Sequence, residues 1–175
     1  MQMADMETAR LRIRGTKESD GAACLDIWLD EEMGRYMVDP PRDLADEDEL
    51  NFAVGIETQG GWYPMVVFHK DTGDFLGTCS VVPKDEGTCW DFGYAVHKRF
   101  WRQGYGTEIL TALIAAGKAQ GVTVFTAAVA QENTASCALL RKLGFRVWKD
   151  DGSYRKRNTS IVYKEYIFRL DVSII

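Results

Sequence analysis

The sequence predicts one mixed α/β domain in which antiparallel strands come first and a strand–helix–strand unit follows. Three observations carry this prediction. Short β-branched and aromatic runs separated by polar turns fill the region before residue 97, and longer helical periodicity follows it. The chain has 175 residues, 46% hydrophobic and 27% charged, which suits one globular domain. No repeat, linker or low-complexity tract interrupts residues 1–175, so we expect a single domain over the whole chain.

The first half is expected to begin with a strand and two helical regions and to continue as a meander of strands. Polar turns containing Asp and Gly, at 71–74 and 84–87, separate the three strands of the meander. A Gly-Gly pair at 60–61 ends the acidic helix that precedes them. The expected elements are a strand at 8–14, a helix at 18–30, a helical or turn segment at 31–38, a helix at 44–59, and strands at 62–69, 74–83 and 88–97.

The second half is expected to hold two helices that alternate with strands. The first helix has one apolar face, formed by Tyr105, Ile109, Leu110, Leu113, Ile114 and Gly117. Asn133 is a suitable cap for the second helix and Gly144 a suitable stop. The expected elements are a helix at 104–120, a strand at 122–130, a helix at 133–143, and strands at 145–149 and 159–171.

The turn between strand 88–97 and helix 104–120 has the composition of a phosphate-binding turn. Its glycines let the backbone approach a ligand, and the first N–H groups of a helix have no intrahelical partner and carry a partial positive charge. The spacing does not fit a Walker loop, and Ile109 stands where a dinucleotide fingerprint needs glycine or alanine. The alternative is a glycine turn that only caps the helix.

Three short motifs together resemble the GNAT acetyltransferases. They are Gly104-x-Gly106 in the turn, Asn133-x-x-Ser136 after the next strand, and Lys142-Leu143-Gly144-Phe145 at the end of the second helix. Trp101 and the run Asp91-Phe92-Gly93-Tyr94 look most like the RimJ/RimL branch, which acetylates N-terminal amines of ribosomal proteins and has relatives that act on small amines. The resemblance covers about residues 8–171.

The resemblance implies a fold and a cofactor site. The fold is a mixed, mostly antiparallel sheet of about six to seven strands flanked by helices, in which the fourth strand (88–97) splays from the fifth (122–130). Acetyl-CoA would lie in the gap, hydrogen-bonded to the backbone of Tyr94, Ala95 and Val96, with Asn133 reaching the pantetheine from the opposite side unless it serves only as a helix cap. The implied pyrophosphate site is Trp101, Arg102, Gln103, Gly104, Tyr105, Gly106 and Thr107.

The implied chemistry is direct acetyl transfer from acetyl-CoA to a primary amine, either a small amine or polyamine or a protein N-terminus. The chain departs from better-understood members, because Leu140 stands at the usual tyrosine acid and Ala128 at a glutamate base found in some members. Asp91 is then the candidate base and Ser136 the candidate proton donor. The plainer alternatives are an edge carboxylate and a helix-capping serine, and a non-catalytic acyl-CoA sensor remains the second functional hypothesis.

Charge and composition limit the kinds of partner that we expect the protein to bind. With 21 basic and 26 acidic residues the net charge is −5, which argues against general nucleic-acid binding. Two histidines and four scattered cysteines make a metal site improbable, so we expect no metal. No apolar run is long enough for a membrane span, and the first residues lack the charged and apolar regions of a secretion signal, which favours a cytoplasmic protein. We expect the protein to be either a monomer or a homodimer. The basic run 155–157 is expected to be a solvated loop.

Overall fold

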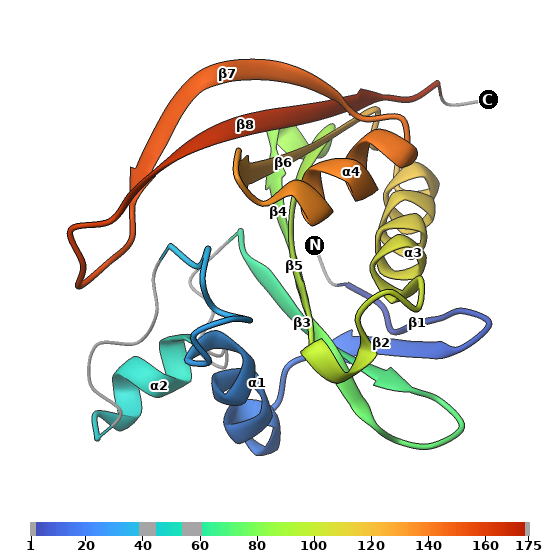
Figure 1. Cartoon of the computed structure of the whole chain (residues 1–175). Coiled ribbons are helices and arrows are strands. Elements are labelled where there is room, and N and C mark those ends of the chain that lie inside the picture. The colour runs from blue at the N-terminus through green and yellow to red at the C-terminus, as the bar shows by residue number, and fades with distance from the viewer. Residues whose placement is uncertain (1–2, 39–44, 54–60, 174–175) are drawn as a thin grey trace.

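A computed structural model describes residues 3–38, 45–53 and 61–173, and it contains one open sheet with helices on both faces (Figure 1). The sheet has eight strands in the order β1-β2-β3-β4-β5-β6-β8-β7. The strands are β1 (Met6–Glu7), β2 (Leu11–Gly15), β3 (Tyr63–His69), β4 (Phe75–Lys84), β5 (Cys89–Val96), β6 (Val124–Ala130), β7 (Arg146–Arg155) and β8 (Val162–Asp171). The α-helices are α1 (Gly21–Trp28), α2 (Glu47–Ala53), α3 (Tyr105–Ala119) and α4 (Thr134–Lys142).

The expected mixed, mostly antiparallel sheet is confirmed, but the count of six to seven strands is wrong. The predicted strand 8–14 is the single strand β2 preceded by a turn at residues 8–10, and the additional strand is β1, which lies before the predicted range and pairs with β2. The Thr8 N–H donates to the Leu11 carbonyl, and the Thr8 hydroxyl accepts from the Leu11 N–H, both over 2.9 Å. A side-chain hydrogen bond of this kind is a local alternative to the ladder that periodicity does not reveal.

The splay between the fourth and fifth predicted strands, here β5 and β6, is also confirmed. All neighbouring strands are antiparallel except this pair, which is parallel and joined at only three positions, the last of them Asp91 opposite Thr126. Beyond that point β5 continues to Val96 along β4, whereas β6 continues to Ala130 along β8. The two strands therefore diverge and leave one edge of each without a strand partner.

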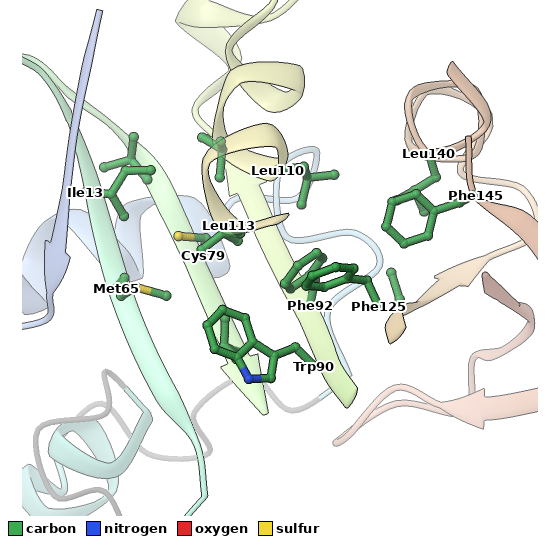
Figure 2. Packing of buried hydrophobic residues seen from close by; sticks show 14 of the residues in the cluster. Ile13, Met65, Cys79, Trp90, Phe92, Leu110, Leu113, Phe125, Leu140 and Phe145 are labelled. Carbon is green, nitrogen blue, oxygen red and sulfur yellow. The ribbon is translucent and has the colours of Figure 1, made fainter. Parts of the chain in front are cut away.

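The two faces of the sheet carry different helices. On one face α3 and α4 cover the main core, where Phe92 stacks on Phe125 with 5.3 Å between ring centroids, close to Leu110 and Leu113 of α3 (Figure 2). On the other face Cys24 of α1 packs on Val66 of β3. Since side chains alternate along a strand, residues on β5 with even numbers face α3 and α4, and those with odd numbers face the α1 side.

Several predicted boundaries change in the structure. Residues 18–20 form a 3₁₀ turn ahead of α1, and 31–36 form turns. The described part of the acidic helix runs over Glu47–Ala53, and the rest of 54–59 lies outside the described residues. The strand predicted at 145–149 extends to Arg155, because two register irregularities against β8 accommodate its polar residues on the sheet edge. None of the described helices has the length and apolar character needed to cross a bilayer.

Candidate active site

The turn predicted to bind phosphate leads from the end of β5 into α3. Arg102 and Gly104 both have left-handed backbones, with φ of 60° and 80°, so the chain reverses sharply before the helix begins. Gly104 is the N-cap and brings no side chain to the first N–H groups of α3. Those donors, together with the helix dipole, point at the outer side of the turn, where the side chain of Arg102 is exposed. This geometry suits an anionic ligand.

The other residues predicted for the turn have distinct roles in shaping it. The Trp101 indole N–H donates to the Val96 carbonyl over 2.6 Å and so fastens the turn to the end of β5. Gln103 donates from its side chain to the Arg99 carbonyl over 3.2 Å. Tyr105 is buried in the core, so its side chain anchors α3 and only its backbone is available to a ligand. Thr107 is half-buried in the first turn of α3, and its carbonyl accepts from the Thr111 hydroxyl.

Gly106 lies at the contact between α3 and α4. A Cβ on this residue would lie 2.6 Å from the end of the Leu139 side chain of α4, so a larger residue would force that side chain to move. The glycine thus allows the first turn of α3 to approach α4 closely. The phosphate turn and the second helix of the site are therefore held together by direct contact, which the glycine spacing alone did not reveal.

A pair of hydroxyl groups joins the two sides of the gap. Tyr94 of β5 and Ser136 of α4 share a short hydrogen bond. Asn133 caps α4, since its side-chain oxygen accepts from the Ser136 N–H over 3.3 Å, and this confirms the predicted cap. Burial raises the pKa of Tyr94 to about 12, although its bond to Ser136 acts in the opposite direction. Leu140, at the usual tyrosine position, is fully buried in the core and donates nothing.

Asp91 lies where β5 and β6 separate. It is the last residue of β5 paired with β6, and it faces the α1 side of the sheet. Its carboxylate accepts from the Thr126 hydroxyl over 2.5 Å and pairs with the Lys84 ammonium at 3.3 Å. Glu165 lies on β8, which pairs with β6, and its pKa is raised by burial and then by the charge of Asp91. The α1 side of the gap therefore has two carboxyl groups, Asp91 and Glu165, close enough for the charge of the first to shift the pKa of the second.

The two predicted catalytic residues are not neighbours. Asp91 faces the α1 side, whereas Tyr94 and its partner Ser136 lie on the α3–α4 side. Tyr94 lies three positions beyond Asp91 on β5, about 10 Å along a strand. The structure therefore places a carboxylate and a hydroxyl pair on opposite faces of the same gap. The sequence analysis did not predict the Tyr94 hydroxyl as a proton donor. Two signals were available: the alternation of side chains along β5 places Tyr94 on the α3–α4 side, and Leu140 offers no donor there.

A wall closes the α1 side of the site and is built from segments far apart in sequence. The Tyr154 and Tyr163 hydroxyls, on β7 and β8, donate to the carbonyls of Tyr36 and Arg35 over 2.8 and 3.2 Å. Lys156 Nζ donates to the Gly34 carbonyl over 2.7 Å and to that of Arg35 over 3.0 Å. The prediction of a solvated basic loop is wrong for Lys156, because its ammonium group donates to carbonyls of the turn after α1.

The wall also uses the acidic helix. Arg157 forms a salt bridge with Glu49 of α2 over 2.9 Å. Asp46 caps the same helix, its carboxylate accepting from the Glu49 N–H over 3.1 Å. These two acidic residues are therefore engaged in structure. Asp43, a further acidic residue just before this helix, lies outside the described residues.

Comparison with known proteins identifies the class. A family model described as an acetyltransferase (GNAT) domain matches residues 10–146, so this chain belongs to the GNAT acetyltransferases. An uncharacterized N-acetyltransferase, p20, from Bacillus licheniformis is 27% identical over 151 residues, covering 82% of this chain and 83% of that protein.

Two solved structures show the same fold with coenzyme A bound. Spermidine N-acetyltransferase from Vibrio cholerae, in complex with CoA and spermine, superposes with a TM-score of 0.78 at 13% identity and covers 94% of this chain and 96% of its own. RimL, a ribosomal L7/L12 alpha-N-protein acetyltransferase in complex with coenzyme A, gives 0.73 at 18% identity over 96% and 97%. The chain therefore shares its fold with these two coenzyme A-bound acetyltransferases, in agreement with its membership of the GNAT family.

Proposed function

We propose that this chain transfers the acetyl group of acetyl-CoA directly to a primary amine that reaches the gap from the α1 side. One observation carries the proposal: a hydroxyl pair and a carboxylate lie on opposite faces of the gap where β5 leaves β6. Acyl transfer needs a base on the side where the nucleophile arrives and a proton donor on the side where the thiol leaves. The cofactor would enter with its pyrophosphate on the Gly104 turn.

The proposed mechanism assigns one proton transfer to each face. The amine nitrogen attacks the thioester carbon while Asp91 accepts a proton from the amine, and a backbone N–H on the unpaired edge of β5 stabilises the oxyanion. When the carbon–sulfur bond breaks, the departing thiolate takes a proton from Ser136 and Tyr94 replaces that proton; Tyr94 then regains a proton from solvent, and Asp91 releases the proton of the amine to solvent. Because burial raises the pKa of Tyr94 to about 12, the phenol carries its proton at neutral pH before each turnover.

We propose a cationic acceptor, either a small amine or polyamine or a protein N-terminus. Asp91 and the carboxyl group of Glu165 together favour a positively charged ligand on the α1 side. The spermidine enzyme and RimL represent these two kinds of acceptor among proteins of the same fold. The RimJ/RimL branch is supported in the same way, by the fold of RimL and by the Trp101 and Asp91–Tyr94 motifs.

The second candidate, a domain that binds acyl-CoA without turning it over, is favoured by one observation. Leu140 occupies the position of the usual tyrosine acid and is completely buried. The Tyr94–Ser136 pair weighs against this candidate because it offers another donor at the gap.

Calorimetric titration with acetyl-CoA, followed by an assay of amine-dependent thiol release, tests the proposal. We expect one-to-one micromolar binding and thiol release that requires an added amine, polyamine or N-terminal peptide. Gly104→Val is expected to abolish binding in a folded protein, because φ of 80° disfavours a β-branched residue and strains the turn. Binding without amine-dependent release would support the sensor, and no binding at millimolar ligand would exclude both candidates.

A further inference from the structure

The start of the chain contacts the phosphate turn through Arg10. This residue lies between β1 and β2, and these two strands pass beside the N-terminal end of α3 (Figure 1). The Arg10 Nη1 donates to the Gln103 carbonyl over 3.0 Å, and its guanidinium carbon lies 4.1 Å from the centre of the Tyr105 ring. Its Nη2 lies 3.5 Å from the position that a Cβ on Gly104 would take. One side chain thus contacts Gln103 and Tyr105 and leaves a donor beside Gly104 between them.

Arg10 also binds Glu108, an acid in the first turn of α3. Its Nε donates to Glu108 Oε2 over 2.7 Å, and its backbone N–H donates to Oε1 over 2.9 Å. The Thr8 hydroxyl donates to the same Oε1 over 2.5 Å. Burial pushes the pKa of Glu108 upward, but the hydrogen bonds from Thr8 and Arg10 outweigh it and the pKa lies below its ordinary value. Glu108 is therefore a carboxylate held by three donors from one turn of chain.

This arrangement resolves an electrostatic conflict at the turn. A carboxylate in the first turn stabilises a helix, because it faces the positive end of the dipole. The same carboxylate repels a pyrophosphate that binds at that helix end. Arg10 neutralises Glu108 and leaves its Nη2 beside Gly104, where the ligand's negative charge would lie. The pair keeps the stabilising acid and restores a positive field at the turn.

We infer that Arg10 is a cofactor-positioning residue, which fixes the phosphate turn through the Gln103 carbonyl and cancels the charge of Glu108 toward the pyrophosphate of acetyl-CoA. The inference rests on the cofactor site of the proposed function and is independent of the acceptor. It places part of the cofactor site far upstream of the turn in sequence, between β1 and β2.

The test compares Arg10→Gln with Arg12→Gln by titration with acetyl-CoA at two salt concentrations. Arg12 lies on the adjacent strand β2 and pairs only with Glu7, both side chains being more than half exposed, so it is a matched control. We expect Arg10→Gln to raise Kd about tenfold, the size of one charge-assisted hydrogen bond, and to reduce its salt dependence. Arg12→Gln should stay within about twofold of the parent. A Kd for Arg10→Gln within that same range overturns the inference.

Two further arms separate positioning from a general structural effect. Glu108→Gln added to Arg10→Gln should recover part of the lost affinity, because the uncompensated carboxylate is then gone. With acetyl-pantetheine, a donor that lacks the pyrophosphate, kcat/KM should be the same for Arg10→Gln and the parent. Equal losses with both donors would show that Arg10 only supports the fold and would overturn the inference.

Arg10→Lys covers the case in which the glutamine variant does not fold. Lysine keeps the charge but lacks the planar fork that reaches Glu108 and Gln103 together. We expect a rise in Kd of about threefold to fivefold for acetyl-CoA, with kcat at saturating cofactor unchanged. A Kd equal to that of the parent overturns the inference. If the parent shows binding but no turnover with any amine, the proposed function fails while the binding arms still test Arg10.

Discussion

The two sides of the gap between β5 and β6 are built in different ways. The cofactor side is formed by short continuous segments, the end of β5 with the turn into α3 and the start of α4. The acceptor side is assembled from residues 34–36, from Asp91, and from the β7–β8 hairpin, with partners up to 128 residues apart. Backbone geometry within short segments determines most of the first side, with Arg10 as a distant support, and tertiary contacts determine the second.

This difference explains how one fold accommodates many acceptors. The backbone conformation of the phosphate turn is set mainly by neighbouring residues, so it is retained when the segments of the acceptor wall change. A wall made of side-chain contacts between distant segments changes with each of them. Variants on the cofactor side should therefore alter chemistry or cofactor affinity, and variants on the wall should alter the acceptor KM.

The largest effect is expected from removing the hydroxyl pair. Ser136→Ala and Tyr94→Phe should each lower kcat about 100-fold at unchanged acetyl-CoA Kd, because the thiolate then leaves without a proton donor. The double variant should be little worse than either single one, since the two hydroxyls act as one unit. Steady-state kinetics together with calorimetry provide the measurement.

Two controls sharpen this prediction. Tyr166→Phe removes a hydroxyl for which the described residues show no hydrogen bond, and it should leave kcat within about twofold. An acetyl donor whose leaving thiol has a pKa near 7 needs little protonation and should restore most of the loss in Ser136→Ala. If both hydroxyl variants keep more than half of kcat, the pair is not the proton donor.

Asp91→Asn should have the next largest effect and should depend on pH. We expect kcat/KM to fall about tenfold at neutral pH and to recover at alkaline pH, where the amine, with an ordinary pKa of about 10, loses its proton unaided. Asp48→Asn, which removes an exposed carboxylate in the first turn of α2, should leave the pH profile unchanged. Full activity of Asp91→Asn along the whole profile would eliminate Asp91 as the base.

The wall should respond more weakly, and only in acceptor binding. Tyr154→Phe removes the 2.8 Å hydrogen bond to the Tyr36 carbonyl and so frees the turn after α1 from the hairpin. We expect the acceptor KM to rise about threefold to fivefold, the cost of one hydrogen bond, with acetyl-CoA Kd and kcat unchanged. Arg155→Gln, on the exposed neighbour, is the control. A Tyr154→Phe variant that weakens acetyl-CoA binding instead would remove the proposed separation of the two sides.

The same contrast governs what the sequence could predict. Gly104, the Asn133 cap and the α3 periodicity are local signals, and each predicted its element correctly. The splay was available only through the family resemblance, since strand pairing is not written in residue spacing. The pairing of Lys156 with carbonyls after α1 depends on a contact between distant segments and had no local signal. The Thr8 turn ahead of β2 is a local hydrogen bond that hydrophobic periodicity does not report. Tyr94 is an intermediate case, because the alternation of side chains along β5 indicates which face of the sheet it lies on but not that its hydroxyl bonds to Ser136.

Glu165→Gln offers the smallest effect and tests the charge on the acceptor face through stability. Burial and the charge of Asp91 raise the pKa of Glu165 in the folded protein above that of the unfolded chain, which is about 4.3. Between these two pKa values the native state binds more protons than the unfolded chain. The destabilisation caused by ionising Glu165 is therefore absent below pH 4 and complete above the folded pKa. The variant should therefore be more stable than the parent at pH 7, and equal to it at pH 4.

The expected gain at pH 7 is under about 1 kcal/mol, because Glu165 is only half-buried and solvent screens its charge. Urea unfolding at both pH values gives the measurement. In the Asp91→Asn background the gain should shrink, since one source of the raised pKa is gone, whereas the part due to burial should remain. A loss of stability at pH 7 would mean that the Glu165 carboxylate is held by a favourable partner and does not add to the attraction of a cationic acceptor.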